Sequence, residues 1–238
     1  MNSSVSSTAR LLGAGLRALL VLTAICGVVY PLAVTGVAQA LFHDQANGSE
    51  IKDESGQVVG SSLIGQTYHL PKNDPDDAEE AAKPDLKWFQ PRPSDGLGSN
   101  SVNTRYALIL SGATNRSADN GAVGGRCTED AEGGTLCAQV VAAKEAVITD
   151  NSTASYRVGP EDVPADAVTS SGSGLDPDIS PAYAGIQVHR VAERNHLDVE
   201  RVEKLVADHT RGRTLGFMGE PRVNVLELNI ALKALTTS

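Results

Sequence analysis

The hydrophobic residues are concentrated in one long run near the start of the chain. Residues 18–42 (ALLVLTAICGVVYPLAVTGVAQALF) carry no charged side chain. A helix rises about 1.5 Å per residue, so this run reaches roughly 37 Å, enough to cross a hydrocarbon core of about 30 Å. The pattern predicts a transmembrane helix over residues 16–42. We expect residues 1–15 to form an N-terminal tail, the first nine of them disordered.

After this run, shorter periodic segments follow one another. Apolar residues at helical spacing predict helices over 135–148, from 182 onward with a break near Asn195, and over 223–235. Ser180 followed by Pro181 is a typical helix start. Residues 57–68, rich in β-branched side chains and interrupted by glycines, predict a short strand and turn. The predicted fold class is α+β, with one transmembrane helix and one α/β domain, residues 43–238, whose C-terminal half is helix-rich.

The charges predict which side of the membrane this domain occupies. Arg10 and Arg17 precede the apolar run, whereas all 29 acidic and 18 of the 20 basic residues follow it, so the later part has a formal charge of −11. Short flanks rich in arginine stay in the cytoplasm. We therefore expect a single-pass protein of the plasma membrane with a cytoplasmic N-terminus and an extracytoplasmic domain. Its acidic surface argues against nucleic acid as a partner.

A secreted protein is the alternative interpretation. Val37-Ala38-Gln39-Ala40 resembles the small-residue cleavage site of a signal peptide, with Pro31 upstream. Cleavage after Ala40 would release an extracytoplasmic binding protein. Signal-peptide cores usually span about 7–15 residues, which favours an uncleaved anchor here. Within such an anchor, Pro31 removes one backbone donor and should bend the helix.

Two of the three cysteines lie in the domain. Cys127 and Cys137 are expected to oxidise if they are exported, and a bridge between them would stabilise the fold by roughly 2.5 kcal/mol. Two unpaired thiols in a loop are the alternative. The remaining cysteine, Cys26, lies in the apolar run and is interpreted as a small hydrophobic residue.

Signatures of catalysis are not found in the sequence. There is no GxxxxGK[ST] phosphate loop and no Asp-Lys-Thr-Gly segment, and Gly172-Ser173-Gly174 lacks the GxSxG spacing of a nucleophile turn. The five histidines have no metal-binding spacing, and Asp176 and Asp178 flank a proline as turn formers commonly do. We predict no catalytic, cofactor-binding or metal-binding residues. A domain anchored by one helix without an active site is most simply an accessory subunit.

A series of short motifs adds a family resemblance. They are Tyr30-Pro31-Leu32, Ala46 to Ser49 (ANGS), Gly60 to Gln66 (GSSLIGQ), Phe89 to Ser94 (FQPRPS), Ser111 to Asn115 (SGATN), Val163 to Thr169 (VPADAVT), Ser171 to Ser180 (SGSGLDPDIS) and Pro221 to Asn229 (PRVNVLELN). In this order they resemble the C subunit (KdpC) of bacterial Kdp-type potassium-transporting ATPases, from about Leu16 to Leu235. The segment 70–86 is longer and more acidic than in that pattern, and a loop or insertion covers about 112–134.

The resemblance implies partners and a role. The partners would be a potassium-channel-like subunit, a P-type ATPase subunit and a small single-helix subunit. The chain itself would hydrolyse nothing. It would assemble and stabilise the complex and act as a catalytic chaperone that raises the ATP affinity of the ATPase subunit. ATP, Mg²⁺ and K⁺ would be bound by the complex as a whole.

The resemblance also assigns candidate partner-contact residues by motif. They are Asn47, Gly48, Gly65, Gln66, Arg92, Pro93, Ser94, Gly174, Leu175, Asp176, Asn224, Glu227, Leu228 and Asn229. In the membrane, close helix packing requires small residues. The candidates for that packing face are Gly27, Pro31, Ala33 and Gly36.

Overall fold

The computed structural model describes residues 2–53, 55–74, 80, 83–93, 122, 127–128 and 135–237. Ser94, most of the acidic segment 74–80 and most of the predicted insertion 112–134 lie outside the described residues. The chain forms two compact units, Met1–Ser49 and Glu50–Ser238. A short helical turn follows the apolar run within the first unit.

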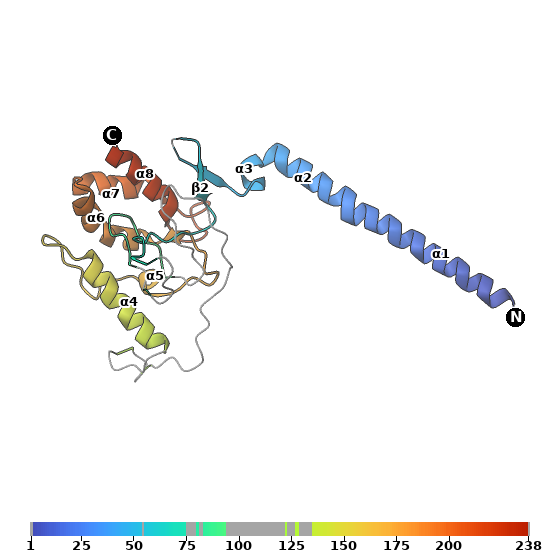
Figure 1. Ribbon diagram of the computed structural model, residues 1–238, viewed down its shortest axis with the longest axis horizontal. Helices are drawn as coiled ribbons and strands as arrows, with labels where there is room; N and C mark the ends of the chain where they lie inside the picture. Colours follow the sequence, from blue (N-terminus) through green and yellow to red (C-terminus); the bar gives the residue numbers. More distant parts are fainter. Residues whose placement is uncertain are drawn as a thin grey trace. The chain divides into compact units, whose positions relative to one another are not determined.

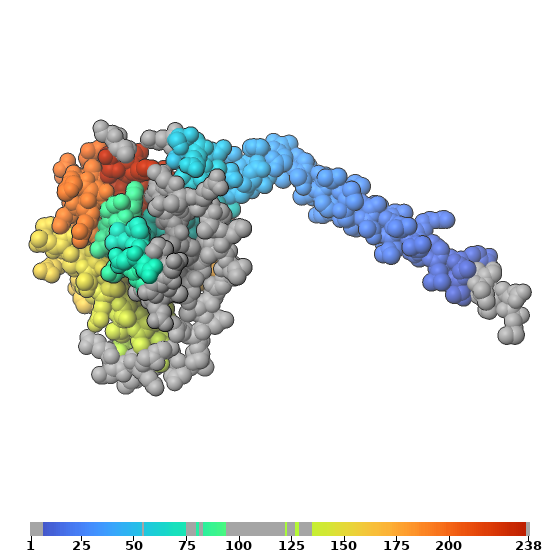
Figure 2. Space-filling view, in the orientation of Figure 1, coloured from blue at the N-terminus to red at the C-terminus, as the bar shows by residue number. Residues whose placement is uncertain are grey.

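The first unit is a long helical rod (Figure 1), drawn in blue in Figure 2. It consists of α1 (Asn2–Ala24), a π-helical turn η1 (Ile25–Val29), α2 (Tyr30–Leu41) and α3 (His43–Ala46). Its segment Ser7–Leu41 is long and apolar enough to cross a membrane. The expectation of a disordered tail was wrong, since the helix already begins at Asn2. Residues 2–24 contain no proline, the residue that most strongly interrupts a helix.

The π-helical turn accommodates Pro31. A proline inside a helix lacks the backbone N–H, and its ring crowds the carbonyl four residues earlier. Here the helix widens just before the proline, and the Tyr30 N–H donates to the Ile25 carbonyl, five residues back. The perturbation that we expected at Pro31 therefore takes the form of a wide turn.

The second unit combines helices with two small sheets (Figure 1). Its elements are β1 (Glu50–Lys52), β2 (Val58–Ser61), α4 (Leu136–Asn151), α5 (Ala165–Val168), β3 (Asp178–Ile179), α6 (Pro181–Asn195), α7 (Val199–Asp208), β4 (Thr210–Arg211), β5 (Arg222–Asn224) and α8 (Val225–Thr237). β1 and β2 form an antiparallel pair, and β5 lies between β3 and β4 with antiparallel pairing on both sides.

Helix α6 is the central element of the core. It contacts α4, α7 and β5, and most of its side chains are buried. The predicted cap is present, because the Tyr183 N–H donates to Ser180 Oγ over 3.0 Å. The predicted break is also present: α6 ends at Asn195, and His196 adopts the left-handed conformation (φ 56°) that turns the chain into α7.

The last predicted helix starts two residues late. Residues 223 and 224, which we predicted to begin it, belong to β5 instead, with Val223 paired to both Ile179 and Thr210. The Val223 side chain is fully buried there. Tertiary pairing overrides the helical pattern at this point.

Candidate functional site

Four motif segments meet at one place in the domain, here called the motif junction. They are the turn 60–66, the strap 85–93, the Gly-Ser loop 169–178 and the segment 224–229, which runs from the end of β5 into α8. The Gly65 N–H donates to the Leu175 carbonyl over 2.8 Å, which joins the turn to the loop. Asn224 Nδ2 at the end of β5 donates to the Ser62 carbonyl over 2.9 Å, which joins this segment to the turn. The sequence motifs are far apart in the chain, but they form one structural unit.

Amide side chains hold the strap against the helices. Asn229 on α8 accepts from the Phe89 N–H and donates to the Phe89 carbonyl, both over 2.9 Å. Gln187 on α6 does the same at Gln90, over 2.7 and 3.1 Å. Both amides are fully buried, and both satisfy main-chain groups that no sheet or helix satisfies. In effect, two side chains replace the neighbouring strand that the strap does not have.

Arg190 holds the beginning of the strap. Its guanidinium donates to the carbonyls of Leu86 and Trp88, and also to Asn151 Oδ1 over 2.8 Å and Gln187 Oε1 over 2.7 Å. Burial lowers the pKa of Arg190 to about 10, against the opposing influence of Tyr183 and Asp150. The group therefore remains charged at neutral pH, and its charge is compensated by dipoles rather than by a carboxylate in contact.

Arg92 fastens the end of the strap to the Gly-Ser loop. It pairs with Asp176 over 2.9 Å and donates to the carbonyls of Thr169 and Ser170. Asp176 in turn accepts from the Asp178 N–H over 3.0 Å. Asp178 pairs with Arg222 on β5 over 2.9 Å, yet burial raises the pKa of its carboxyl above the ordinary value. The ion pair thus compensates the burial of Asp178 only in part.

Gly60 allows the turn to close over Gln66. Gln66 is buried and donates to the Val59 carbonyl over 3.0 Å. A Cβ at position 60 would lie 2.2 Å from Gln66 Nε2 and 2.7 Å from Leu226 Cδ2. A Cβ at position 60 would force the ends of both side chains to move, so a glycine lets the turn and α8 approach each other this closely without such a shift.

The remaining predicted residues lie in various places. Asn47 and Gly48 belong to the first unit, where Asn47 bonds with Gln39 and with the His43 carbonyl. In the second unit, Glu227 pairs with Arg211 and Leu228 is a fully buried core residue. Gly174 is buried in the Gly-Ser loop, and Pro93 is half-buried at the end of the strap. The predicted packing residues Gly27, Pro31, Ala33 and Gly36 are exposed on the rod.

The chemistry of the junction is that of a scaffold. Its polar side chains face main-chain groups or paired charges, an arrangement that fixes loops in place rather than activating a nucleophile. Within the described residues, no group of three or more His, Cys, Asp or Glu side chains is placed to hold a metal ion. A surface cavity of ≈ 520 Å³ lies elsewhere, along α4, and is lined by residues such as Val141, Lys144 and Ile148. None of the junction residues lines it.

The sequence motifs did not reveal the residues of α4 and α6 that complete the junction. Gln187, Arg190, Asn151 and Asn195 all hold the strap or its supports. A signal was present, because Gln187 and Arg190 are polar residues among the apolar positions of a strongly patterned helix. Buried polar residues of this kind usually hydrogen-bond to a loop.

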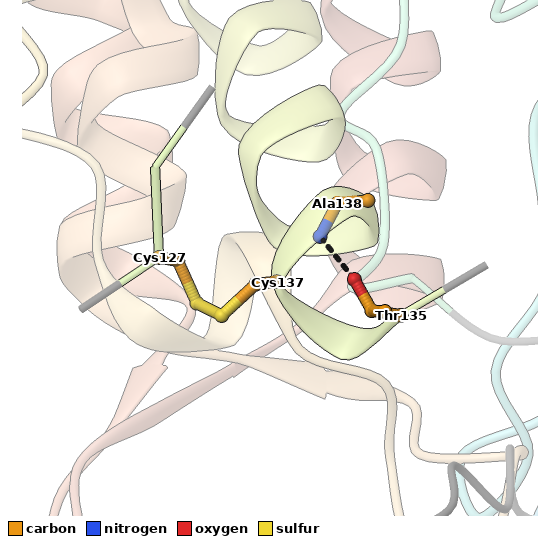
Figure 3. The surroundings of a disulfide bond; sticks show 4 residues. All are labelled: Cys127, Thr135, Cys137 and Ala138. Atoms are coloured by element: carbon orange, nitrogen blue, oxygen red, sulfur yellow. Dashed lines mark hydrogen bonds between the residues drawn. A yellow bond between two sulfur atoms is a disulfide. The ribbon is translucent and has the colours of Figure 1, made fainter. Parts of the chain in front are cut away.

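A disulfide joins Cys127 to Cys137 at the start of α4 (Figure 3), as the sequence favoured. The helix is also capped there, since Thr135 Oγ1 accepts from the Ala138 N–H over 3.2 Å. The Cys137 side chain is buried. The bridge therefore fixes the segment before α4 to the first turn of that helix.

Replacing both Cys127 and Cys137 with serine is expected to lower the free energy of unfolding by about 2.5 kcal/mol, chiefly through the freer unfolded chain. Urea unfolding of the full chain, followed by circular dichroism, measures the change. Reducing the parent protein with dithiothreitol should reproduce the same loss, and the reductant should leave the double variant unaffected. Equal stability of parent and variant would contradict the prediction.

Comparison with known proteins shows that nearly the whole chain, both the apolar helix and the domain, matches one family. The family model for the K+-transporting ATPase, c chain, matches residues 12–234. The chain is 66% identical to a potassium-transporting ATPase KdpC subunit of Streptomyces avermitilis over the whole length of both proteins. It is 64% identical to that of Streptomyces coelicolor over 99% of this chain and 97% of the relative. The KdpC subunit of Mycobacterium bovis is 40% identical over 92% of this chain and 96% of its own length.

These matches, together with a helix long and apolar enough to span a membrane, define a membrane subunit of an ion-transporting ATPase. The chain belongs to the KdpC family of potassium-transporting ATPase subunits. Because the chain belongs to this family of transport-complex subunits, a secreted binding protein cleaved after Ala40 is not favoured.

Proposed function

We propose that the chain is a non-catalytic accessory subunit that assembles and stabilises the potassium-uptake complex. The observation that supports this proposal most directly is the motif junction, where buried polar groups hold the strap and the Gly-Ser loop in fixed positions. A rigid scaffold of this kind suits a surface that other proteins bind. Its partners in this proposal are the channel-like subunit, the P-type ATPase subunit and the small single-helix subunit.

The charge pattern suggests how the chain acts on ATP use. With Arg10 and Arg17 on the cytoplasmic side, the acidic domain faces outward, away from cytoplasmic ATP. We propose that hydrolysis takes place on the ATPase subunit, and that the chain raises the ATP affinity of that subunit through a conformational coupling. Such coupling requires the chain to make different contacts in two states of the complex. ATP, Mg²⁺ and K⁺ are then bound by the complex as a whole.

The helix supplies a direct test of assembly. Gly36 is exposed, and a Cβ at this position meets no atom of the chain within 4 Å. Gly36→Leu therefore leaves the rod itself intact, but it keeps a neighbouring helix from close approach. We expect this variant to lose most of the channel-like subunit when the tagged chain is purified from detergent. Val34→Leu, also exposed on α2, is the matched control and should retain its partners.

The coupling is tested on complexes purified through a tag on the ATPase subunit, with and without the chain. Complexes depleted of the chain should show a KM for ATP about fivefold higher or more, the lower end of typical coupling energies. An unchanged KM for ATP would contradict the chaperone role and leave assembly of the complex as the proposed function. ATP turnover by the purified chain alone would overturn the proposal of a non-catalytic subunit.

A further inference from the structure

The disulfide at the start of α4 joins one exposed cysteine to one buried cysteine. Cys127 is exposed, whereas the exposed fraction of Cys137 is 1%. A thiolate that breaks a disulfide attacks one sulfur and displaces the other as a new thiolate, and access decides which sulfur is attacked. Cys127 is therefore the cysteine open to attack, and Cys137 is the leaving group.

The position of Cys137 favours its release. It is the second residue of α4, two residues after the capping Thr135 (Figure 3). The main-chain N–H groups of the first helical turn give a helix N-terminus a partial positive charge, which stabilises a thiolate. A more stable thiolate leaves a disulfide faster. The disulfide is thus arranged to open in one direction, with the buried sulfur departing.

A cavity adjoins the exposed cysteine. Cys127 lines the cavity of ≈ 520 Å³ along α4, and Cys137 is not among the described residues that line it. Cavities of about 300–1,000 Å³ are typical of small-molecule sites. A molecule held in this cavity lies beside the one cysteine of the pair that is open to attack.

The walls of the cavity indicate the class of molecule that fits. Val141, Ile148 and Pro160 supply apolar contacts, and Lys144 and Glu145 supply charges of opposite sign. An amino-acid or small peptide thiol carries carboxylate and ammonium groups beside its thiol. Lys144 suits the carboxylate and Glu145 suits the ammonium. The cavity therefore favours a zwitterionic thiol over a neutral one of similar reactivity.

We propose that this cavity binds a small amino-acid or peptide thiol, which reversibly thiolates Cys127. The bound thiol loses its proton to solvent, and its thiolate attacks Cys127 Sγ. The bond between Cys127 and Cys137 breaks, and its electron pair goes to Cys137 Sγ. The product is a mixed disulfide at Cys127, and the segment before α4 is no longer tied to the first turn of that helix.

Cys137 makes the modification reversible. Its thiolate attacks Cys127 Sγ of the mixed disulfide, the original bridge forms again, and the small thiol leaves as a thiolate. The exchange consumes no oxidant, because the number of disulfide bonds is the same before and after each step. This inference does not depend on the proposed accessory role.

Mass spectrometry locates the mixed disulfide. The full chain in detergent is incubated briefly with glutathione, quenched with acid and treated with N-ethylmaleimide to block free thiols. Cleavage after Glu129 or Glu132 separates the two cysteines. We expect about tenfold more glutathione on Cys127 than on Cys137, with the maleimide on Cys137 of the same molecules. Equal amounts of glutathione on both cysteines would overturn the proposal.

The rate of bridge opening tests the cavity itself. We expect Lys144→Met to slow the reaction with glutathione about threefold and to leave the reaction with neutral 2-mercaptoethanol unchanged. Lys204→Met, which removes the same charge from α7, is the matched control and should slow neither reaction.

Two results would overturn the cavity as the binding site of the thiol. One is an equal effect of K144M on both thiols, since Lys144 would then act on the disulfide rather than on the reagent. The other is a bridge that glutathione leaves intact but thioredoxin reduces, because the reacting partner would then be a protein.

Discussion

Replacing Arg190 with methionine is expected to lower the free energy of unfolding of the domain by about 4 kcal/mol. The exposed fraction of Arg190 is 2%, and its guanidinium serves four acceptors, among them the carbonyls of Leu86 and Trp88. Methionine fills much of the same volume but donates nothing. The Leu86 carbonyl and Asn151 Oδ1 then lose this donor, Gln187 Oε1 keeps only the Gln90 N–H, and the beginning of the strap loses its attachment to α6.

Two probes on the full chain measure this loss. Urea unfolding followed by circular dichroism reports on the helices, whereas the fluorescence of Trp88 reports on the strap. We expect both transitions to shift to lower urea together, because the strap packs Phe89 into the same core as α6 and α8. An early fluorescence transition alone would instead show that the strap opens independently.

Arg194 supplies the matched control. It lies one helical turn further along α6 and is exposed. Arg194→Met removes the same positive charge from the same helix, and we expect a change within about 0.5 kcal/mol. A similar loss for R190M and R194M would show that net charge, and not the buried hydrogen bonds, explains the effect.

The long apolar segment and the larger helices could be predicted from the sequence. Their signals are local: an uncharged run long enough to cross a membrane, apolar residues at helical spacing, and Ser180-Pro181 at the start of α6. The strands were mostly missed for a physical reason. β3 and β4 have two residues each, so no periodicity can appear, and their pairing with β5 depends on parts of the chain far apart in sequence.

The candidate site was predicted as a set of motif residues, but not as a junction. The motifs name Arg92, Asp176 and Asn229, and the structure brings their segments together. The partners of these residues are mainly backbone carbonyls and N–H groups, which any sequence supplies. Side-chain identity therefore does not reveal which loop a buried amide holds.

Replacing Asn229 with leucine is expected to lower the free energy of unfolding by about 3 kcal/mol. Asn229 is fully buried and bonds to both the N–H and the carbonyl of Phe89, whose own ring is fully buried. Leucine keeps the volume and the apolar contacts of position 229, but it leaves two buried main-chain groups unpaired, each costing about 1–3 kcal/mol. Urea unfolding of the full chain measures the loss. This loss should hardly change between about pH 5 and pH 8, the range in which most domains are stable, because neither asparagine nor leucine titrates.

Asn229→Asp separates the hydrogen bonds from the packing. The carboxylate can still accept from the Phe89 N–H, but it donates to the Phe89 carbonyl only when it is protonated. Burial raises the pKa of such a carboxyl above the unfolded value of about 4, so the folded protein binds more protons than the unfolded chain between the two pKa values. The stability of N229D relative to the parent is therefore greatest below about pH 4 and falls as the pH rises through the folded pKa. Urea midpoints of N229D and N229L, measured across this pH range, test the prediction. The same flat pH profile for both variants would contradict the role of Asn229 as a donor to the strap.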